Sequence, residues 1–253
     1  YAGGTSRARY FQLRGLGELS QFSGEGAPHF YVGYIIDNID FSGIGMIGIL
    51  SDIKQIEIFK GPQSSVYGPN AMAGVINLVS KNPSKNKVLD ISTSSYSNNG
   101  YNYNVSSSLE LSQKLFSRFT LSTNYTDGFI KNISDKNNPK SNTNSKDESL
   151  FRVKFLYQPN IYASILLTTY FVDLNNKYDV WTPDNNGFAT FSDFQGYDKQ
   201  NTKAFSINSK FDLINSTLTS ITAYSDNKMA YSYDGDWGNI IYLKKCYTTC
   251  SAY

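Results

Sequence analysis

Few side chains in this sequence are of the types that do chemistry, and none has the spacing of a catalytic or metal site. His29 is the single histidine of the 253 residues, with no nucleophile or metal ligand beside it. Cys246 and Cys250 have no histidine or further cysteine nearby, so a loop disulfide is our preferred interpretation and two free thiols the alternative. The stretch from Gly61 to Gly68 lacks the Gly-Lys-Ser/Thr ending of a phosphate-binding loop. We therefore expect no enzyme, no cofactor and no bound metal.

Aromatic and acidic side chains gather in two polar segments, Asp179 to Asp198 and Asp226 to Asp236, without the spacing of a Ca²⁺ loop. Aromatic faces among polar neighbours suit sugar or catecholate-type ligands, although packing within loops or in an interfacial girdle explains them equally well. From these regions we predict Tyr178, Trp181 and Trp237 as ligand contacts.

The composition is polar yet rich in aromatic residues, with 20 Tyr and 16 Phe at a mean hydropathy of -0.38. A soluble β-sandwich has this character, and so does a membrane β-barrel, in which only alternate residues face lipid. No apolar run approaches the roughly 20 residues of a membrane-spanning helix. The net charge of +2 comes with no basic block, so nucleic acid is not an expected partner.

Alternation of apolar and polar residues dominates the chain beyond Lys85. In Tyr101 to Leu111, for example, aromatic and aliphatic residues share one face while Asn, Ser and Glu share the other. In Ile161 to Asp173 either parity could be the apolar one. About seven strands are predicted: 88–96, 101–111, 118–125, 151–157, 161–173, 203–211 and 216–227.

The predicted connections alternate in length. Tight turns are expected at 112–114, 158–160 and 213–215, and long polar loops at 127–148, 175–202 and from Asp234 onward. Outer-membrane barrels have short periplasmic turns and long extracellular loops, so this segregation favours a barrel over a soluble all-β domain.

The first part of the chain differs, with short β-rich runs at 30–36, 55–60 and 75–80 and helical turns expected at Ser64 to Tyr67 and around Met72. We place the boundary between two domains at 85/86, giving units of residues 1–85 and 86–253.

The stretch from Leu50 to Pro83, LSDIKQIEIFKGPQSSVYGPNAMAGVINLVSKNP, resembles the distal plug signature of TonB-dependent outer-membrane receptors of the siderophore or iron-complex type. Two earlier elements also resemble this family: Leu13 to Gly17, and Phe30 to Asp40, where Asn38 stands in place of the usual glycine in a turn that needs a positive φ. The residues that match or stand at signature positions are Arg14, Gly15, Asp37, Glu57, Lys60, Gly61, Pro62, Tyr67, Gly68, Gly74 and Asn77.

This resemblance implies an all-β membrane protein with an α+β plug: the C-terminal portion of the plug, then about the first seven strands of an incomplete antiparallel transmembrane β-barrel, which has about 22 strands in complete members. It implies a Gram-negative outer-membrane receptor that takes up a scarce solute, with energy from the TonB–ExbB–ExbD complex, and a ferric siderophore is the first choice of solute. Oligosaccharide or cobalamin uptake and a non-transporting adhesin or structural barrel are the alternatives. We expect this stretch alone to be a fragment that is not competent in transport.

By the same resemblance, the ligand contacts of the plug are expected in the loops 17–27 and 41–48, at Gln21, Phe22, Phe41 and Met46. Charges enclosed in a barrel lumen must find partners. We expect Arg14, Glu57 and Lys60 of the plug to pair with inward charges of the strands. The candidates are Arg118, Arg152, Lys154 and Glu110.

Overall fold

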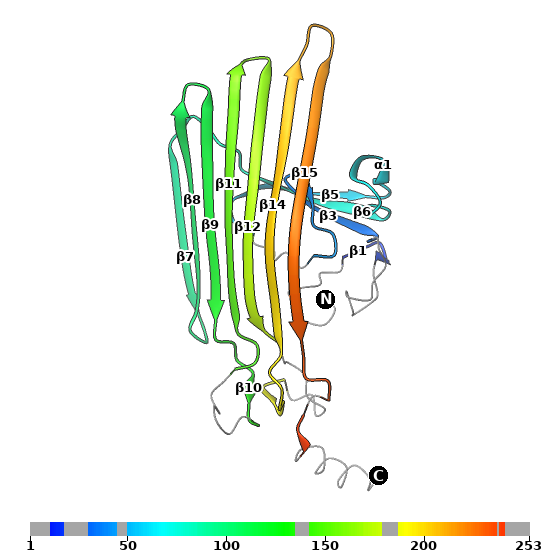
Figure 1. Ribbon diagram of the computed structural model, residues 1–253, viewed down its shortest axis with the longest axis vertical. Helices are drawn as coiled ribbons and strands as arrows, with labels where there is room; N and C mark the ends of the chain where they lie inside the picture. The colour runs from blue at the N-terminus through cyan, green and yellow to red at the C-terminus, as the bar shows by residue number, and fades with distance from the viewer. Residues whose placement is uncertain are drawn as a thin grey trace.

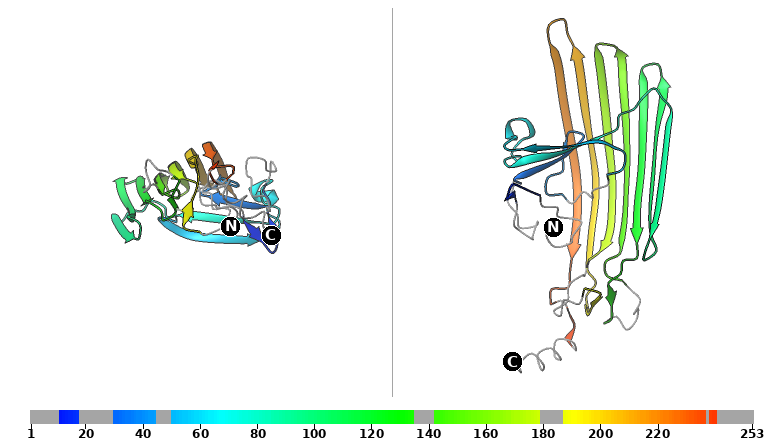
Figure 2. Two further views of the ribbon diagram at one scale, coloured as in Figure 1. Left: turned by 90° about the horizontal axis from the view of Figure 1, so that it is seen from below. Right: turned by 180° about the vertical axis from the view of Figure 1, so that it is seen from behind.

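The computed structural model describes residues 11–17, 30–44, 50–134, 142–178, 187–236 and 238–240. It has two parts: a long, curved antiparallel sheet, and a small N-terminal unit packed against one face of it (Figures 1 and 2). We call that face the inner face and the opposite one the outer face. Among the described residues, no helix has the length and apolar character needed to cross a membrane.

The long sheet has seven strands in the order β15-β14-β12-β11-β9-β8-β7, each strand pairing antiparallel with the next along the chain. The predicted seven strands are therefore confirmed. Their bounds are β7 Val88–Tyr96, β8 Gly100–Ser112, β9 Leu115–Thr126, β11 Lys146–Asn160, β12 Ala163–Lys177, β14 Tyr197–Asp212 and β15 Thr217–Ser232.

Several predicted strand ends were wrong. The turn expected at 158–160 lies instead at Ile161 and Tyr162, because β11 continues through an irregularity between Tyr157 and Asn160. Strands β12, β14 and β15 also extend into segments that we had taken for loops. In β14 the added residues from Asp198 to Thr202 are polar on both faces, so they carry no alternation that the sequence could reveal.

Tight turns and long connections separate to opposite ends of the sheet, as predicted. In Figure 1 the turns β8–β9, β11–β12 and β14–β15 lie at the top, and the long connections β9–β11 and β12–β14 at the bottom. The bottom end also has one tight turn, β7–β8, where Asn98 and Asn99 adopt φ of 62° and 54°. Asparagine tolerates this left-handed conformation better than most residues.

The outer face carries cross-strand aromatic pairs, such as Phe151 with Phe171 and Phe205 with Tyr224, whose ring centroids lie 6.3 and 5.9 Å apart. One step toward the long connections, Lys203 of β14 lies opposite Asp226 of β15. Charges thus begin where the aromatic band ends, which is typical of a strand leaving lipid for water.

The N-terminal unit is a four-stranded sheet in the order β4-β3-β6-β5, formed by β3 Val32–Ile36, β4 Ile39–Asp40, β5 Ile53–Lys60 and β6 Gly74–Ser80. The short strands β1 Gln12–Leu13 and β2 Leu16–Gly17 form a separate hairpin. Helix α1 spans Ser64–Tyr67 as predicted, but the stretch around Met72 is a bend rather than a helical turn.

The core lies between the N-terminal unit and strands β11, β12 and β14. Its buried members are Tyr34, Ile36, Ile39, Phe41 and Leu78 on one side and Leu150, Tyr170, Val172, Leu174 and Ala204 on the other. This packing explains the ambiguous parity of β12: Phe171 faces outward, while its neighbours Tyr170 and Val172 fill the core. A strand apolar on both faces gives no single alternating pattern.

Candidate functional site

Two turns of the N-terminal unit, each with an aspartate at positive φ, insert into a cluster of cations on the inner face of the long sheet. Asp37, with φ of 47°, lies in the β3–β4 hairpin turn, and Asp52, with φ of 60°, directly precedes β5. Asn38 adopts φ of 67°, so the predicted tolerance of asparagine in place of glycine is confirmed.

The cations are Arg118 of β9 and Arg152 and Lys154 of β11. Arg118 and Lys154 are direct cross-strand neighbours, and their side chains are only 4% and 2% exposed. Like charges opposite each other destabilise a sheet, and buried charges without partners are costlier still. The inner face therefore requires carboxylates from outside the sheet.

Asp37 makes the first contact between the N-terminal unit and the long sheet. Its carboxylate accepts hydrogen bonds from the Ser80 backbone N–H at 2.9 Å, the Ser80 hydroxyl at 2.5 Å, the Tyr170 hydroxyl and the Lys154 ammonium at 3.1 Å. Burial would raise the pKa of Asp37, but Lys154 and the hydroxyl donors Ser80 and Tyr170 lower that pKa below its ordinary value of 3.8. Asp37 is therefore an anion whose carboxylate oxygens accept hydrogen bonds from both the N-terminal unit and the long sheet.

Asp52 makes the second contact. Arg118 binds its two carboxylate oxygens with Nε at 2.6 Å and Nη2 at 2.5 Å, and Thr120 donates its hydroxyl at 2.9 Å. Arg152 lies 3.5 Å from the same carboxylate and donates to the Ser51 carbonyl at 3.0 Å. Burial would raise the pKa of Asp52, but these hydrogen bonds and the two arginines lower it.

The predicted charge pairing is thus half right. Arg118, Arg152 and Lys154 do bind the N-terminal unit, but their partners are Asp52 and Asp37. The predicted partner Glu57 instead accepts from Asn77 at 2.7 Å and from Gln55 at 2.7 Å. Arg14, Lys60 and Glu110 are exposed, and within the described part of the chain no ion pair involves them.

The other signature positions have clear structural roles. Gly61, at φ of 100°, ends β5 ahead of Pro62, and Gly74, at φ of 151°, lies so close to β5 that a Cβ would be 2.3 Å from the Phe59 carbonyl oxygen. Gly15 and Gly68 also adopt positive φ, and the Tyr67 ring packs on Phe59 at 5.9 Å. These residues shape the plug unit.

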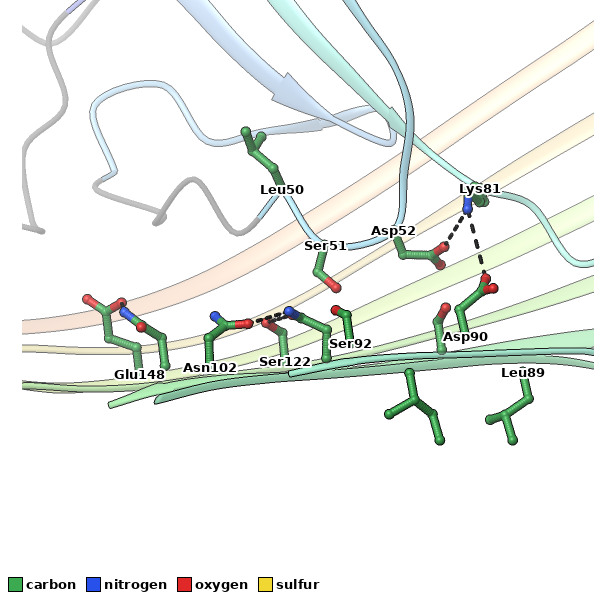
Figure 3. A pocket seen from close by; sticks show the side chains of 14 residues that line it. Leu50, Ser51, Asp52, Lys81, Leu89, Asp90, Ser92, Asn102, Ser122 and Glu148 are labelled. Carbon is green, nitrogen blue, oxygen red and sulfur yellow. Dashed lines mark hydrogen bonds and ion pairs between the residues drawn. The ribbon is translucent and has the colours of Figure 1, made fainter. Parts of the chain in front are cut away.

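Beside the Asp52 contact lies a polar groove of about 740 Å³, between the turn at 50–52 and strands β7, β8, β9 and β11. In Figure 3 the wall side chains Asp90, Ser92, Asn102, Ser122 and Glu148 point toward Ser51 and Asp52, whereas Leu89 points to the outer face. The groove runs from Asp52 toward the end of the sheet that carries the long connections, because Glu148 lies two residues into β11.

The groove wall holds its own hydrogen bonds. Asn124 and Asn176 donate to the two oxygens of Glu148 at 2.8 and 3.0 Å, and Ser122 donates to Asn104 at 2.5 Å. Lys81 reaches Asp52 at 3.7 Å and Asp90 at 3.9 Å. Sequence reasoning missed this groove, because its wall is the ordinary polar face of four separate strands.

Of the predicted ligand contacts, Gln21, Phe22, Met46, Trp181 and Trp237 lie outside the described residues, as do Cys246 and Cys250 and most of the predicted plug loops. Phe41 packs edge-on against Tyr170 and is fully buried, so it has the position of a core residue with no surface left for a ligand. Tyr178 follows β12 at the long-loop end, where its ring lies 5.3 Å from Tyr231, which in turn lies 5.5 Å from Tyr233.

One acidic cluster occurs in the described part of the long connections. Asp193, Asp234 and Asp236 bring carboxylate oxygens within 4.8 Å of one another, although no spacing in the sequence suggests it. Burial and then the Asp236 carboxyl raise the pKa of Asp234. We assign no ion to this cluster.

Comparison with known proteins agrees with this architecture. Residues 1–75 match the family model of the TonB-dependent receptor plug domain. The ferric yersiniabactin uptake receptor FyuA from Yersinia pestis superposes on 92% of this chain with a TM-score of 0.80 at 19% identity. The siderophore receptor PiuA from Acinetobacter baumannii matches 78% with a TM-score of 0.63 at 17% identity, and the pyoverdine outer membrane receptor FpvA from Pseudomonas aeruginosa matches 82% with 0.64 at 14%.

A plug unit held against the inner face of a wall of antiparallel strands is the fold of the plug and of part of the barrel in these receptors. Residues 1–75 belong to the TonB-dependent receptor plug domain family, and the chain as a whole shares the fold of outer-membrane siderophore receptors. It spans 37%, 29% and 32% of the lengths of FyuA, PiuA and FpvA, about a third of each.

Proposed function

We propose that the receptor imports a ferric siderophore across the outer membrane with energy supplied by the TonB–ExbB–ExbD complex. The observation that carries this proposal is the pair of buried contacts at Asp37 and Asp52, which fasten the plug unit to the barrel wall. A lumen closed in this way needs an energy source to open it. The receptors it resembles in fold, FyuA, PiuA and FpvA, are a ferric yersiniabactin uptake receptor, a siderophore receptor and a pyoverdine receptor.

We propose that the ligand first binds among the long connections, with the aromatic trio Tyr178, Tyr231 and Tyr233 among its contacts. The trio lies at the end of the sheet away from the tight turns, and the Tyr233 side chain is 40% exposed. Aromatic rings give a rigid apolar surface with a polar hydroxyl, which suits planar chelating groups.

The test is uptake of radiolabelled iron by iron-starved cells that express the receptor in full, with a panel of ferric siderophores, in hosts with and without TonB. We expect energy-dependent uptake of at least one chelate that disappears without TonB. TonB-dependent import of cobalamin or an oligosaccharide instead would keep the class and refute the iron assignment. Surface binding without import of any solute would indicate a structural barrel or adhesin.

A matched pair of variants tests the aromatic trio. Tyr233→Ala should weaken surface binding of the imported chelate by about tenfold, the effect of losing one well-placed aromatic contact. Tyr224→Ala on the outer face, where the ring is 60% exposed, should leave that affinity unchanged. Equal effects of the two substitutions would remove the trio from the ligand site.

A further inference from the structure

The Asp52 contact has the composition of an anion-binding site in which the anion belongs to the protein itself. A carboxylate is held by two fork-like hydrogen bonds from Arg118, a hydroxyl from Thr120 and the nearby guanidinium of Arg152. All three donors are on strands of the barrel wall, and their side chains are almost fully buried. Arginine is the side chain best suited to two-point recognition of planar anions.

The carboxylate comes from a turn that is lightly attached. Among the described contacts, the turn at 50–52 reaches the wall through the Asp52 side chain and through the Ser51 and Asp52 carbonyls, which accept from Arg152. The remainder of the unit is held separately by Asp37 and by the apolar core on β11, β12 and β14. On the plug side, the Lys81 N–H donates to the Asp52 carbonyl at 3.0 Å and Ile53 packs against the core, so the Asp52 carboxylate leaves Arg118 by a local movement of the turn while Asp37 and the core keep the rest of the unit docked.

Withdrawal of the turn would change the charge of the groove. With Asp52 in place, the three carboxylates Asp52, Asp90 and Glu148 balance the three cations Lys81, Arg118 and Arg152. Without it, three cations face two carboxylates and all three lose an ion-pair partner: Arg118 keeps Asp90 at 3.6 Å, and Arg152 has no carboxylate left among its ion pairs in the described residues. An excess of buried positive charge attracts an anion that reaches it.

We propose that Arg118, Arg152 and Thr120 form a transit site for an anionic group of the transported solute, occupied at rest by Asp52. The solute's carboxylate or catecholate oxygens replace Asp52 on Arg118 once the turn withdraws, and the polar wall of β7, β8 and β9 leads to them from the long-loop end. This inference rests on the proposed function, and it adds the charge class of the substrate.

The first experiment removes the resident carboxylate and supplies a free one. Asp52→Gly suits the φ of 60° and vacates the site without disturbing the turn. The probe is citrate, compared with sodium chloride at equal ionic strength, and the readout is the thermal unfolding midpoint of the plug in the purified receptor. We expect citrate to raise the midpoint of Asp52→Gly by about 2–4 °C and to leave the wild type unchanged.

The double variant Asp52→Gly/Arg118→Gln should lose the citrate effect, while Asp52→Gly/Lys203→Gln, which removes an exposed cation of the outer face, should retain it. A folded Asp52→Gly receptor without citrate stabilisation overturns the proposal, and so does equal stabilisation in the Arg118→Gln background. If Asp52→Gly does not fold, Asp52→Ala takes its place with the same criteria, because it also empties the site and adds a backbone cost of about 1–2 kcal/mol at the positive φ.

The second experiment measures transport. Arg118→Gln should lower import of an anionic ferric chelate by about tenfold while its affinity at the cell surface stays within about twofold, because only the transit step is affected. Arg118→Lys, which keeps the charge but not the fork, should restore part of the rate. Failure of the wild type to import any chelate would refute the proposed function, whereas normal import by Arg118→Gln would refute this inference alone.

Discussion

The buried contact at Asp37 gives the sharpest prediction about how the plug is held. Asp37→Asn keeps the size of the side chain and tolerates the φ of 47°, so the hairpin turn should form as before. The amide, however, presents one acceptor where the carboxylate uses two oxygens for Ser80, Tyr170 and Lys154. Lys154, 2% exposed, is left without a counter-ion.

The size of the effect follows from that burial. Removing one partner of a buried ion pair destabilises by about 3–5 kcal/mol, because the remaining charge stays desolvated. At about 1.4 kcal/mol for each factor of ten, plug opening should become about 10²- to 4 × 10³-fold more frequent. The double variant Asp37→Asn/Lys154→Met removes both charges, and we expect it to regain most of the loss.

Hydrogen exchange of the β3 amides in the purified receptor measures this opening directly, because β3 pairs with β6 inside the plug and packs on the wall. Exchange in β12, on the barrel side, serves as the internal reference. Unchanged β3 exchange in Asp37→Asn would refute the reasoning. If the double variant opens as often as the single one, the lost hydrogen bonds of Asp37, rather than the unpaired charge of Lys154, account for the loss of stability.

Three further predictions concern pH, backbone and lipid. Folding lowers the pKa of the buried plug carboxylate Asp52, so the stability that this carboxylate contributes is complete above its ordinary pKa of 3.8 and is lost as pH falls through the lower folded-state pKa. Proteolysis of the plug should therefore accelerate only below about pH 4. Gly74→Ala, at φ of 151° against the β5 backbone, should destabilise the plug by about 1–3 kcal/mol in denaturant unfolding, whereas Gly235→Ala, with open space around it, should not. Ile207→Lys on the outer face should cost about 2–4 kcal/mol of folding free energy at the membrane midplane, which would appear as a smaller folded fraction of the barrel in heat-modifiability gels. Asn208→Lys on the inner face should have little effect.

Local patterns were enough to predict the strands and the turns of the plug. Alternation identified seven strands because one face meets lipid, and Gly61 with Pro62 marked a strand end because few other residues adopt that geometry. Where both faces are polar, as in the first residues of β14, or both apolar, as in β12, the pattern vanished and the predicted ends failed.

The partners of the buried cations were beyond sequence reasoning. Arg118 and Asp52 are 66 residues apart, and Lys154 and Asp37 are 117 apart, so their contact depends on how one folded unit docks on another. One local signal was available: both aspartates lie in tight turns at positive φ, where an acidic side chain can project beyond its own sheet.

The inner wall is divided, and this division links the fold to the proposed transport. Neighbouring cross-strand positions are polar on β8 and β9, as in Asn104 beside Ser122. The inner apolar side chains concentrate on β12, as in Val172 beside Leu150 of β11, a strand whose inner face also carries charged residues. The apolar half excludes water, and the apolar surface buried there anchors the plug. This stabilisation is lost only when a large area of the plug separates from the wall. The polar half is covered through a few hydrogen bonds from the turn at 50–52, and such contacts can exchange with water or with a solute at little net cost. Opening should therefore begin over β7 to β9, while the plug keeps its place on β11 to β14.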